Sequence, residues 1–481
     1  MRARIFDEAN RKWWTLGAVC FALFMIMLDN TVVNVALPAI KRDLGLSLTS
    51  LEWTVAGYAL VFAVLMLTGG KLADMLGRRK IFMLGLAIFT LSSLACGLAD
   101  SAGTLIAARG VQGAGAALMA PATLSIITAT FAAHERGLAI GMWAGVSAVA
   151  LAVGPLVGGL ITEHVSWHWI FYVNVPIGLV GLVVTRLVVP ESRDTSKEQR
   201  LDLWGLVSSS VGLLALVYAL IKGNHYGWAS PLILGLFAFA AVALAVFVVL
   251  ERRQRVPMLD LSLFRSGTFA GANVVAILVT LAMFGVFFFL PIYMQSFLGW
   301  SPVEAGAAFL PWTILIVVLA PVAGRLSDRV GSRWLVTAGM TTVAASCFSL
   351  STLELESSYW DVLPGFVLGG LGMSFVMTPM SAAVMGAVPV AKSGVGSAVL
   401  NTFRQVGAAL GIALTGAILA HRATDAARDG ASADEAFVHG LTSALRVSGV
   451  IALASAAVAA VFIRRYRHVE ADERPALAEA A

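Results

Sequence analysis

Charged residues are scarce in this chain of 481 residues. Asp, Glu, Lys and Arg make up 13% of it, whereas 59% of the residues are hydrophobic. A soluble domain of this length cannot bury so much apolar surface, so the composition excludes one. Helices pair their own backbone groups, and a span of roughly 20 apolar residues crosses a lipid bilayer. We therefore predict an all-α integral membrane protein.

Cysteines and catalytic motifs are also few. The three cysteines, Cys20, Cys96 and Cys347, lie inside apolar segments and offer no disulfide framework. The sequence lacks a G-x-x-x-x-G-K-[ST] phosphate loop, an H-E-x-x-H metal motif and a nucleophile elbow. We accordingly expect no enzyme activity, no metal and no cofactor. The expected energy source is an ion gradient rather than ATP.

About fourteen segments have the length and composition of a membrane span. They divide into six in residues 1–189, two in residues 190–266 and six in residues 267–463, followed by a tail at 464–481. The predicted spans lie near residues 14–38, 52–73, 81–99, 104–131, 138–162, 169–189, 203–222, 229–250, 269–296, 302–324, 333–352, 360–387, 394–420 and 441–463.

Basic residues in the connecting loops gather on the side of the N-terminus, which predicts that both termini are cytoplasmic. The net charge of +5 comes from these loops. We therefore expect contact with anionic membrane lipid and no binding of nucleic acid.

One loop sequence occurs twice, as GKLADMLGRRK at 70–80 and GRLSDRVGSRW at 324–334. Each copy has an acid at the end of an apolar run, then a glycine and arginines, which predicts a tight cytoplasmic turn. Duplicated membrane halves are typical of alternating-access transporters. We interpret the turns as a gate; solvated charges that only fix topology are the alternative. The residues assigned to the gate are Gly70, Asp74, Gly77, Arg78, Arg79, Gly324, Asp328 and Arg329.

Asp29 and Arg109 are charged residues inside apolar spans of the first half. Asp29 lies in the first span, where a charge needs a protein partner or a proton. Arg109 enters the fourth span from outside and reaches a similar depth, with Gln112 on its helix face. Because a guanidinium keeps its proton, we predict that Asp29 is the proton site and Arg109 a fixed charge that competes for it. A permanent ion pair or a helix clamp without a coupling role is the alternative.

Glycines occur in register in the fifth and eleventh spans. The matching pairs are Gly141 with Gly394, Gly154 with Gly407 and Gly158 with Gly411. Small residues permit close helix crossing, either as packing alone or as a sliding seam between the halves. The predicted packing motif comprises Gly145, Gly154, Pro155, Gly158 and Gly159, with a kink expected at the proline.

Large adaptable side chains inside the spans are candidates for a substrate cavity, because Met and aromatic groups suit varied apolar ligands and lipophilic cations. Packing against core or lipid is the alternative. Arg404, near mid-depth, can contact substrate, an internal carboxylate or lipid carbonyls. The predicted lining is Asn34, Gln112, Phe284, Phe288, Met377, Asn401, Arg404 and Gln405, with Met283, Phe287, Tyr293, Met294, Met373 and Met380 as further candidates.

Together these segments resemble the major facilitator superfamily, specifically its fourteen-span drug:proton antiporters of the multidrug efflux type. GKLADMLGRRK is similar to the family's loop motif and LIAARGVQGAGAALMAP to its fourth-helix motif. GVSAVALAVGPLVGG is similar to the fifth-helix antiporter motif, which the family associates with export. LDNTVVNVALP, WHWIFYVNVPIG and VPMLDLSLFR are similar to segments typical of the fourteen-span group.

The resemblance implies two six-helix bundles about a central cavity, with two extra helices at the periphery, in a bacterial cytoplasmic membrane. It makes Asp29 the first-helix acid, Arg109 the coupling arginine, and Asp74 with Arg78 a cytoplasmic lock against residues 392–394. The implied function is proton-coupled export of drugs or other lipophilic small molecules, cations among them, by a monomer. A dedicated exporter of one antibiotic or metabolite, and a non-transporting receptor or scaffold, are the alternatives.

Overall fold

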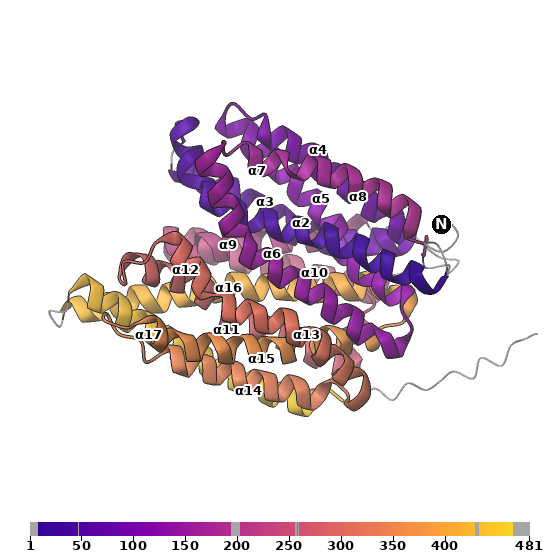
Figure 1. Ribbon diagram of the computed structural model, residues 1–481. Helices are drawn as coiled ribbons and strands as arrows, with labels where there is room; N and C mark the ends of the chain where they lie inside the picture. The colour runs from indigo at the N-terminus through magenta and orange to yellow at the C-terminus, as the bar shows by residue number, and fades with distance from the viewer. Residues whose placement is uncertain are drawn as a thin grey trace, which may run out of the picture.

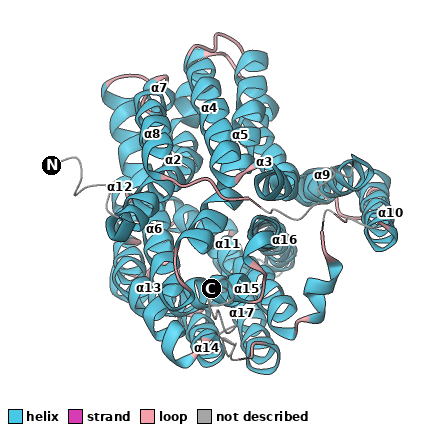
Figure 2. Ribbon diagram, turned by 90° about the vertical axis from the view of Figure 1, so that its right-hand side faces the viewer, coloured by secondary structure: helices cyan, strands magenta, loops and turns pink. Residues whose placement is uncertain are grey.

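The described part of the chain consists of helices joined by turns and loops, with no strand (Figure 2). The computed structural model describes residues 8–46, 48–193, 203–254, 257, 259–428 and 432–464. The all-α prediction is therefore confirmed.

The first half contains seven helices and a 3-10 turn, η1 (Ala133–Glu135). The helices are α2 (Glu8–Asp43), α3 (Leu48–Leu76), α4 (Arg78–Gly97), α5 (Ala102–Thr130), α6 (Arg136–His164), α7 (Trp169–Tyr172) and α8 (Asn174–Val188). The pair α9 (Leu203–Tyr226) and α10 (Pro231–Arg253) follows, and η2 (Leu261–Arg265) leads into the second half.

The second half also contains seven helices, and η3 (Val390–Lys392) precedes its longest helix. The helices are α11 (Gly267–Ser296), α12 (Pro302–Ala308), α13 (Leu310–Val330), α14 (Ser332–Leu350), α15 (Tyr359–Gly386), α16 (Ser393–Arg428) and α17 (Ala433–Phe462).

Each predicted span coincides with one helix or with two consecutive short helices. Eleven helices among the described residues are long and apolar enough to cross a membrane. The membrane-spanning fold is thus confirmed, whereas the count of fourteen spans and the domain boundaries remain predictions.

The two repeated loops form the same sharp turn. Gly77 separates α3 from α4 with a φ of 115°, and Gly331 separates α13 from α14 with a φ of 86°. Side chains of L residues rarely adopt these backbone angles, which explains a glycine at both places.

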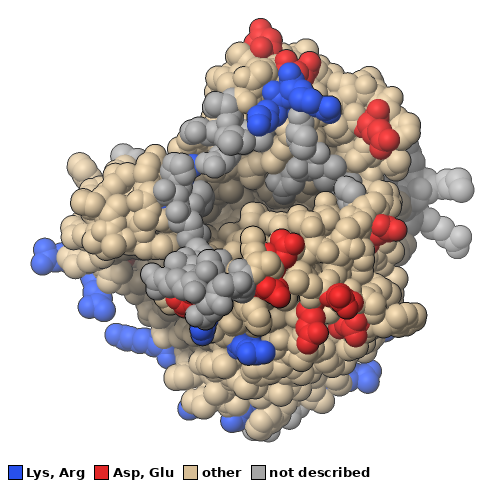
Figure 3. Space-filling model, turned by 90° about the vertical axis from the view of Figure 1, so that its left-hand side faces the viewer, with Lys and Arg blue, Asp and Glu red and all other residues tan. Residues whose placement is uncertain are grey.

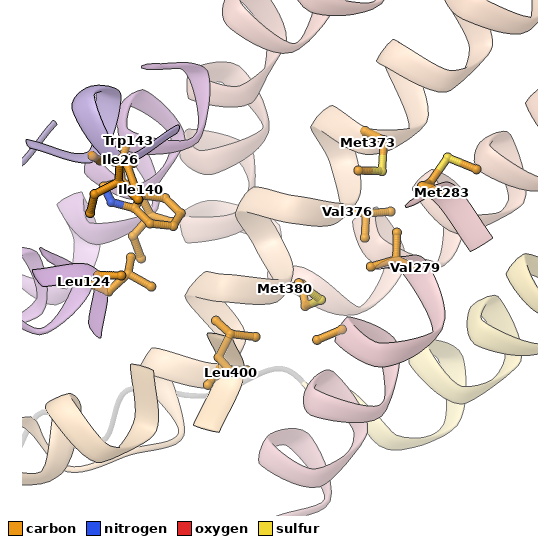
Figure 4. Packing of buried hydrophobic residues seen from close by; sticks show 14 of the residues in the cluster. Ile26, Leu124, Ile140, Trp143, Val279, Met283, Met373, Val376, Met380 and Leu400 are labelled. Atoms are coloured by element: carbon orange, nitrogen blue, oxygen red, sulfur yellow. The ribbon is translucent and has the colours of Figure 1, made fainter. Parts of the chain in front are cut away.

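The two halves lie one above the other in Figure 1, indigo to purple for α2–α8 and salmon to yellow for α11–α17. Buried apolar side chains pack inside both halves and form one cluster that continues from one half to the other. Figure 4 shows Ile26, Leu124, Ile140 and Trp143 grouped in the first half, and Val279, Met283, Met373, Val376 and Met380 grouped in the second.

The halves meet through α3 against α16 and through α6 against α13, while α9 contacts both α3 and α16. Figure 2 shows α9 and α10 beside these two helices, outside the paired bundles. At the end of the molecule opposite the repeated turns, Figure 3 shows a surface hollowed between the two halves. The space between the halves is therefore closed at one end and open at the other.

Candidate functional site

Asp29 and Arg109 meet inside the first half, in a cluster that we call the Asp29 network. Arg109 Nη1 donates to Asp29 Oδ2 at 2.6 Å and to Gln112 Oε1 at 2.6 Å. Gln112 Nε2 donates to the second carboxylate oxygen, Oδ1, at 2.9 Å. Asp29 is 3% exposed and Arg109 is 1% exposed. Both charges are thus removed from solvent and are satisfied mainly by each other.

The Arg109 side chain is fixed by three further contacts. Its Nε donates to the backbone oxygen of Thr54 at 3.2 Å. The guanidinium carbon lies 4.3 Å from the ring centre of Tyr58 and 5.8 Å from that of Phe171, within the range of cation–π attraction. This planar cation fits between carboxylate, amide and ring in a way that a lysine ammonium would not.

Asn174 joins the network from the start of α8, and sequence reasoning missed it. Its Nδ2 donates to Ser93 Oγ at 3.1 Å and lies 3.4 Å from Asp29 Oδ1. Asn174 is 1% exposed. The only sequence signal is an amide within the apolar segment WHWIFYVNVPIG, and an uncharged polar residue does not demand a partner as a charge does.

At the first repeated turn, Asp74 connects the two halves. It accepts hydrogen bonds from the backbone amides of Gly394 and Val395 in α16, both at 2.9 Å. Arg78 donates to the same carboxylate at 2.9 Å and 3.1 Å. The arginine also reaches the backbone oxygen of Val390 at 2.5 Å. We call this cluster the Asp74 gate; both its charged side chains are buried.

At the second repeated turn, the corresponding contact is weaker. Asp328 accepts hydrogen bonds from the backbone amides of Gly137, at 3.1 Å, and Leu138 in α6. Its side chain is exposed, unlike that of Asp74. The repeat places Ser332 where the first copy has Arg78, and Ser332 bonds to Ser327 at 2.8 Å instead. The two halves therefore touch at both turns, but only the first turn carries a buried ion pair.

The other predicted gate residues support the turns. Glycine allows the close approach of backbones: a Cβ on Gly70 would collide with the Gly394 carbonyl, and one on Gly324 with the Gly137 carbonyl. The backbone amide of Arg79 donates to Glu191 at 3.1 Å. Arg329 is exposed.

The candidate cavity residues fall into several environments. Gln112 is fully buried in the Asp29 network, whereas Phe284 and Phe288 are 37% and 51% exposed. Met377, Asn401, Arg404 and Gln405 are half-buried, and the side chain of Asn34 lies outside the described ones. Asn401 donates to the Ser397 backbone oxygen one turn earlier, at 2.9 Å.

Most of the further candidates from α11 and α15 belong to the packed interior of the second half. The buried ones are Met283, Tyr293, Met294, Met373 and Met380. Methionine fills irregular gaps between helices, and a uniformly apolar helix does not reveal which face meets its neighbours. For these residues, the prediction of a cavity lining is wrong.

A family model described as Major Facilitator Superfamily matches residues 19–412 and, separately, residues 273–480. The chain belongs to the major facilitator superfamily. Solved structures agree with this facilitator fold. The human organic anion transporter MFSD10 aligns with a TM-score of 0.68 at 13% identity, over 93% of this chain and 99% of that one. The proton:xylose symporter XylE aligns with a TM-score of 0.67 at 14% identity, over 95% and 97%.

Sequence relatives of this facilitator protein cover nearly its full length. It is 34% identical to the tetracenomycin C resistance and export protein of Streptomyces glaucescens, over 97% of this chain and 93% of the relative. It is 39% identical to the puromycin resistance protein of Streptomyces alboniger, over 94% and 92%. The multidrug resistance protein Stp of Mycobacterium tuberculosis is 38% identical over 84% of this chain and 75% of its own length.

The glycines of this facilitator chain have two different neighbourhoods. Gly141 packs on the backbone of Ala320 in α13, and Gly145 lies near Val317 of the same helix, so both face the opposite half. Gly154 and Gly158 instead pack on α2 within the first half. Gly159 is half-buried, and the side chain of Pro155 lies outside the described ones.

The register partners in α16 repeat this division. Gly394 packs on the first half at Gly70, whereas Gly407 and Gly411 pack on α11 within the second half. The register therefore reflects the internal duplication, and only its first pair lies between the halves.

Proposed function

We propose that this protein is a proton-coupled antiporter that exports drugs or other lipophilic small molecules by alternating access. The Asp29 network carries this proposal. A carboxylate and a guanidinium that are both almost fully buried are costly unless paired. A proton added to Asp29 removes one charge of the pair and so changes the stability of the conformation that holds it.

The proton cycle follows from the network's chemistry. A proton from outside neutralises Asp29, which then loses its charge-assisted bond to Arg109 at 2.6 Å. Arg109 keeps its charge and its contacts with Gln112 and Thr54. The loosened network favours the inward-facing conformation, and Asp29 releases its proton to the cytoplasm.

Alternating access also requires that one side of the protein is closed while the other is open. With the repeated turns on the cytoplasmic side, the Asp74 gate closes that side and the hollow of Figure 3 opens outward. Inward opening then requires Gly394 and Val395 to leave Asp74. We propose that the protein works as a monomer in the bacterial cell membrane with both termini in the cytoplasm.

The relatives support export of toxic small molecules and also favour a second candidate. Tetracenomycin C and puromycin resistance each concern one antibiotic, whereas Stp is described as a multidrug protein. A dedicated exporter of one antibiotic is therefore the second candidate function. Growth protection by the expressed protein against a chemically mixed panel separates them: protection against unrelated compounds supports the multidrug function, and protection against one scaffold the dedicated function.

Proton coupling is tested in everted vesicles with compounds against which the protein gives protection. Uptake is expected to require an imposed pH gradient and to fall to background when an uncoupler is added. Asp29→Asn is expected to abolish this dependence, because the amide cannot exchange a proton. Asp361→Asn is the matched control: this exposed acid, in the first turn of α15, accepts from the amide of the N-cap Ser358 at 2.7 Å, and the asparagine side-chain oxygen can accept the same bond.

Gradient-driven uptake that is the same in wild type and Asp29→Asn would refute the assignment of the proton site. Purified protein in liposomes tests transport itself: absence of flux across such a panel would favour the receptor or scaffold alternative.

A further inference from the structure

Arg404 is a cation without a partner in the middle of the protein. It lies on α16, about 16 Å along the helix from Ser393 at 1.5 Å per residue. No described residue forms a hydrogen bond or ion pair with it. The side chain is nevertheless only half-buried, so it borders open space. A guanidinium has five N–H donors, and here they are available.

The neighbours of α16 show which space this is. Gly407 and Gly411 press against the backbone of α11 on one side. Ala398 meets Gly70 of α3 on another, and Val406 packs with the apolar cluster of α3 and α9. At 100° per residue, Arg404 lies between the α11 face and the α3 face. That direction is the space between the two halves.

Two exposed phenylalanines of α11 border the same space. Phe287 packs against Phe309 and Trp312 on one side of the helix, with ring centres 5.8 Å and 5.0 Å apart. Gly285 packs against α16 on the other. Phe284 and Phe288 project between these contacts and are 37% and 51% exposed. They lie about 26 Å or more along α11 from Gly267, so they are nearer the open end than Arg404.

The acids that could neutralise Arg404 are engaged elsewhere. Asp29 is held by Arg109 and Gln112, and Asp74 by Arg78 and two backbone amides. A deep cation beneath aromatic side chains matches a ligand with an anionic group on an aromatic or apolar body.

We propose that Arg404 binds the anionic group, a carboxylate or an ionised phenol or enol, of an amphiphilic substrate whose apolar body rests on Phe284 and Phe288. This proposal rests on the export function above, and it replaces lipophilic cations by organic anions as the preferred substrate class. Asn401 and Gln405, half-buried on the neighbouring face of α16, are placed to assist as polar contacts.

The test measures equilibrium binding in nanodiscs of phosphatidylcholine, which carries no net charge. The probes share one ring system: 2-naphthoate, its neutral amide, and 2-naphthylmethylammonium. Wild type is expected to bind naphthoate most tightly. Arg404→Gln is expected to weaken naphthoate binding about ten- to hundredfold, to the level of the amide, as for loss of a hydrogen bond to a charged group. Arg404→Lys is expected to give an intermediate affinity, because lysine keeps the positive charge but cannot form two parallel hydrogen bonds to a carboxylate as a guanidinium can.

Arg446→Gln is the matched control. Arg446 is a second arginine without a described partner; it is exposed, in a groove between α14 and α17 beside Phe348 and Ser351. Naphthoate binding is expected to be unchanged in this variant.

Two results with wild type would overturn the proposal: no binding of any probe, or tighter binding of the ammonium or the amide than of naphthoate. Equal weakening of all three probes by Arg404→Gln would also overturn it. Displacement of naphthoate by added phosphatidylglycerol would overturn it too, because Arg404 would then bind the phosphate of a lipid headgroup. Because no gradient is imposed, these outcomes are independent of proton coupling. A protein that binds naphthoate through Arg404 but shows no gradient-driven flux would refute the antiport mechanism alone.

Discussion

Replacement of Asp74 by asparagine is expected to shift the protein toward the inward-facing conformation. The carboxylate accepts from Gly394 and Val395 of the opposite half and from Arg78 of its own half. Opening of the cytoplasmic side breaks the first two bonds. Their strength depends on the negative charge, which the amide lacks.

The magnitude follows from burial and from the remaining contacts. A hydrogen bond to a charged group contributes about 1.5–3 kcal/mol, and opening breaks two such bonds, those from Gly394 and Val395. The asparagine oxygen can still accept a weaker bond, and Arg78 keeps its bonds to the backbone oxygens of Val390 and Ala391, at 2.5 Å and 3.2 Å, so we expect a loss of about 3 kcal/mol. About 3 kcal/mol corresponds to roughly a hundredfold change in the ratio of the two conformations.

A cysteine at position 404 reports this change. Arg404→Cys places a thiol at mid-depth in the space between the halves, and the native Cys20, Cys96 and Cys347 are buried. In everted vesicles, a membrane-impermeant maleimide labels this thiol only in the inward-facing conformation. Addition of Asp74→Asn is expected to raise the labelling rate up to about a hundredfold.

The second repeat provides the comparison. Asp328 is exposed and accepts hydrogen bonds only from backbone amides of the opposite half. Asp328→Asn is therefore expected to destabilise the closed conformation by about 1 kcal/mol, which raises the labelling rate about fivefold. Equal effects of the two substitutions, or no effect of Asp74→Asn, would refute the argument that the buried Asp74 carboxylate holds the cytoplasmic side closed.

Two further predictions concern the same end of the molecule. A Cβ on Gly394 would lie 2.5 Å from a backbone oxygen of α3, so Gly394→Ala is expected to cost about 1–3 kcal/mol in the closed conformation and to reduce vesicle uptake. Gly386→Ala, where nothing lies within 4 Å, is expected to leave uptake unchanged; equal loss in both variants would contradict the packing argument. Lys392 donates to Asp260 at 2.7 Å, and although burial alone raises the pKa of Asp260, hydrogen bonds from this lysine and a serine lower it overall. The ion pair therefore stabilises the fold above the ordinary aspartate pKa, and this stabilisation is lost as pH falls through the lowered pKa of Asp260. Asp260→Asn is expected to change the free energy of unfolding, measured by thermal unfolding near neutral pH, by less than about 1 kcal/mol. A larger change would contradict the assignment of this pair to the surface.

The membrane spans were predictable because apolar length alone specifies them. Pairing of Asp29 with Arg109 was also accessible from sequence, since each charge needs a partner at its depth and few exist. Asn174 was not accessible in this way, because a neutral amide carries no such requirement. The four buried methionines of α11 and α15 were misassigned because helices that are apolar on all faces give no sign of which face meets a neighbour.

The repeated loop was recognisable, but the unequal strength of its two copies was not. Substitution of Arg78 by Ser332 in the second copy is visible in the sequence. Its consequence depends on contacts across the halves: Val390 and Ala391 lie where the first arginine can reach them. Such pairings join residues that are far apart in the chain, and sequence spacing does not encode them.

The position of α9 gives the transporter two unlike flanks. Because α9 touches α3 and α16 together, it covers the line along which one half meets the other on that flank, as Figure 2 shows. A hydrophobic compound dissolved in the bilayer is shielded from the central space there. On the opposite flank α6 and α13 close the line of contact themselves, with the backbone at Gly137 against Gly324 and at Gly141 against Ala320.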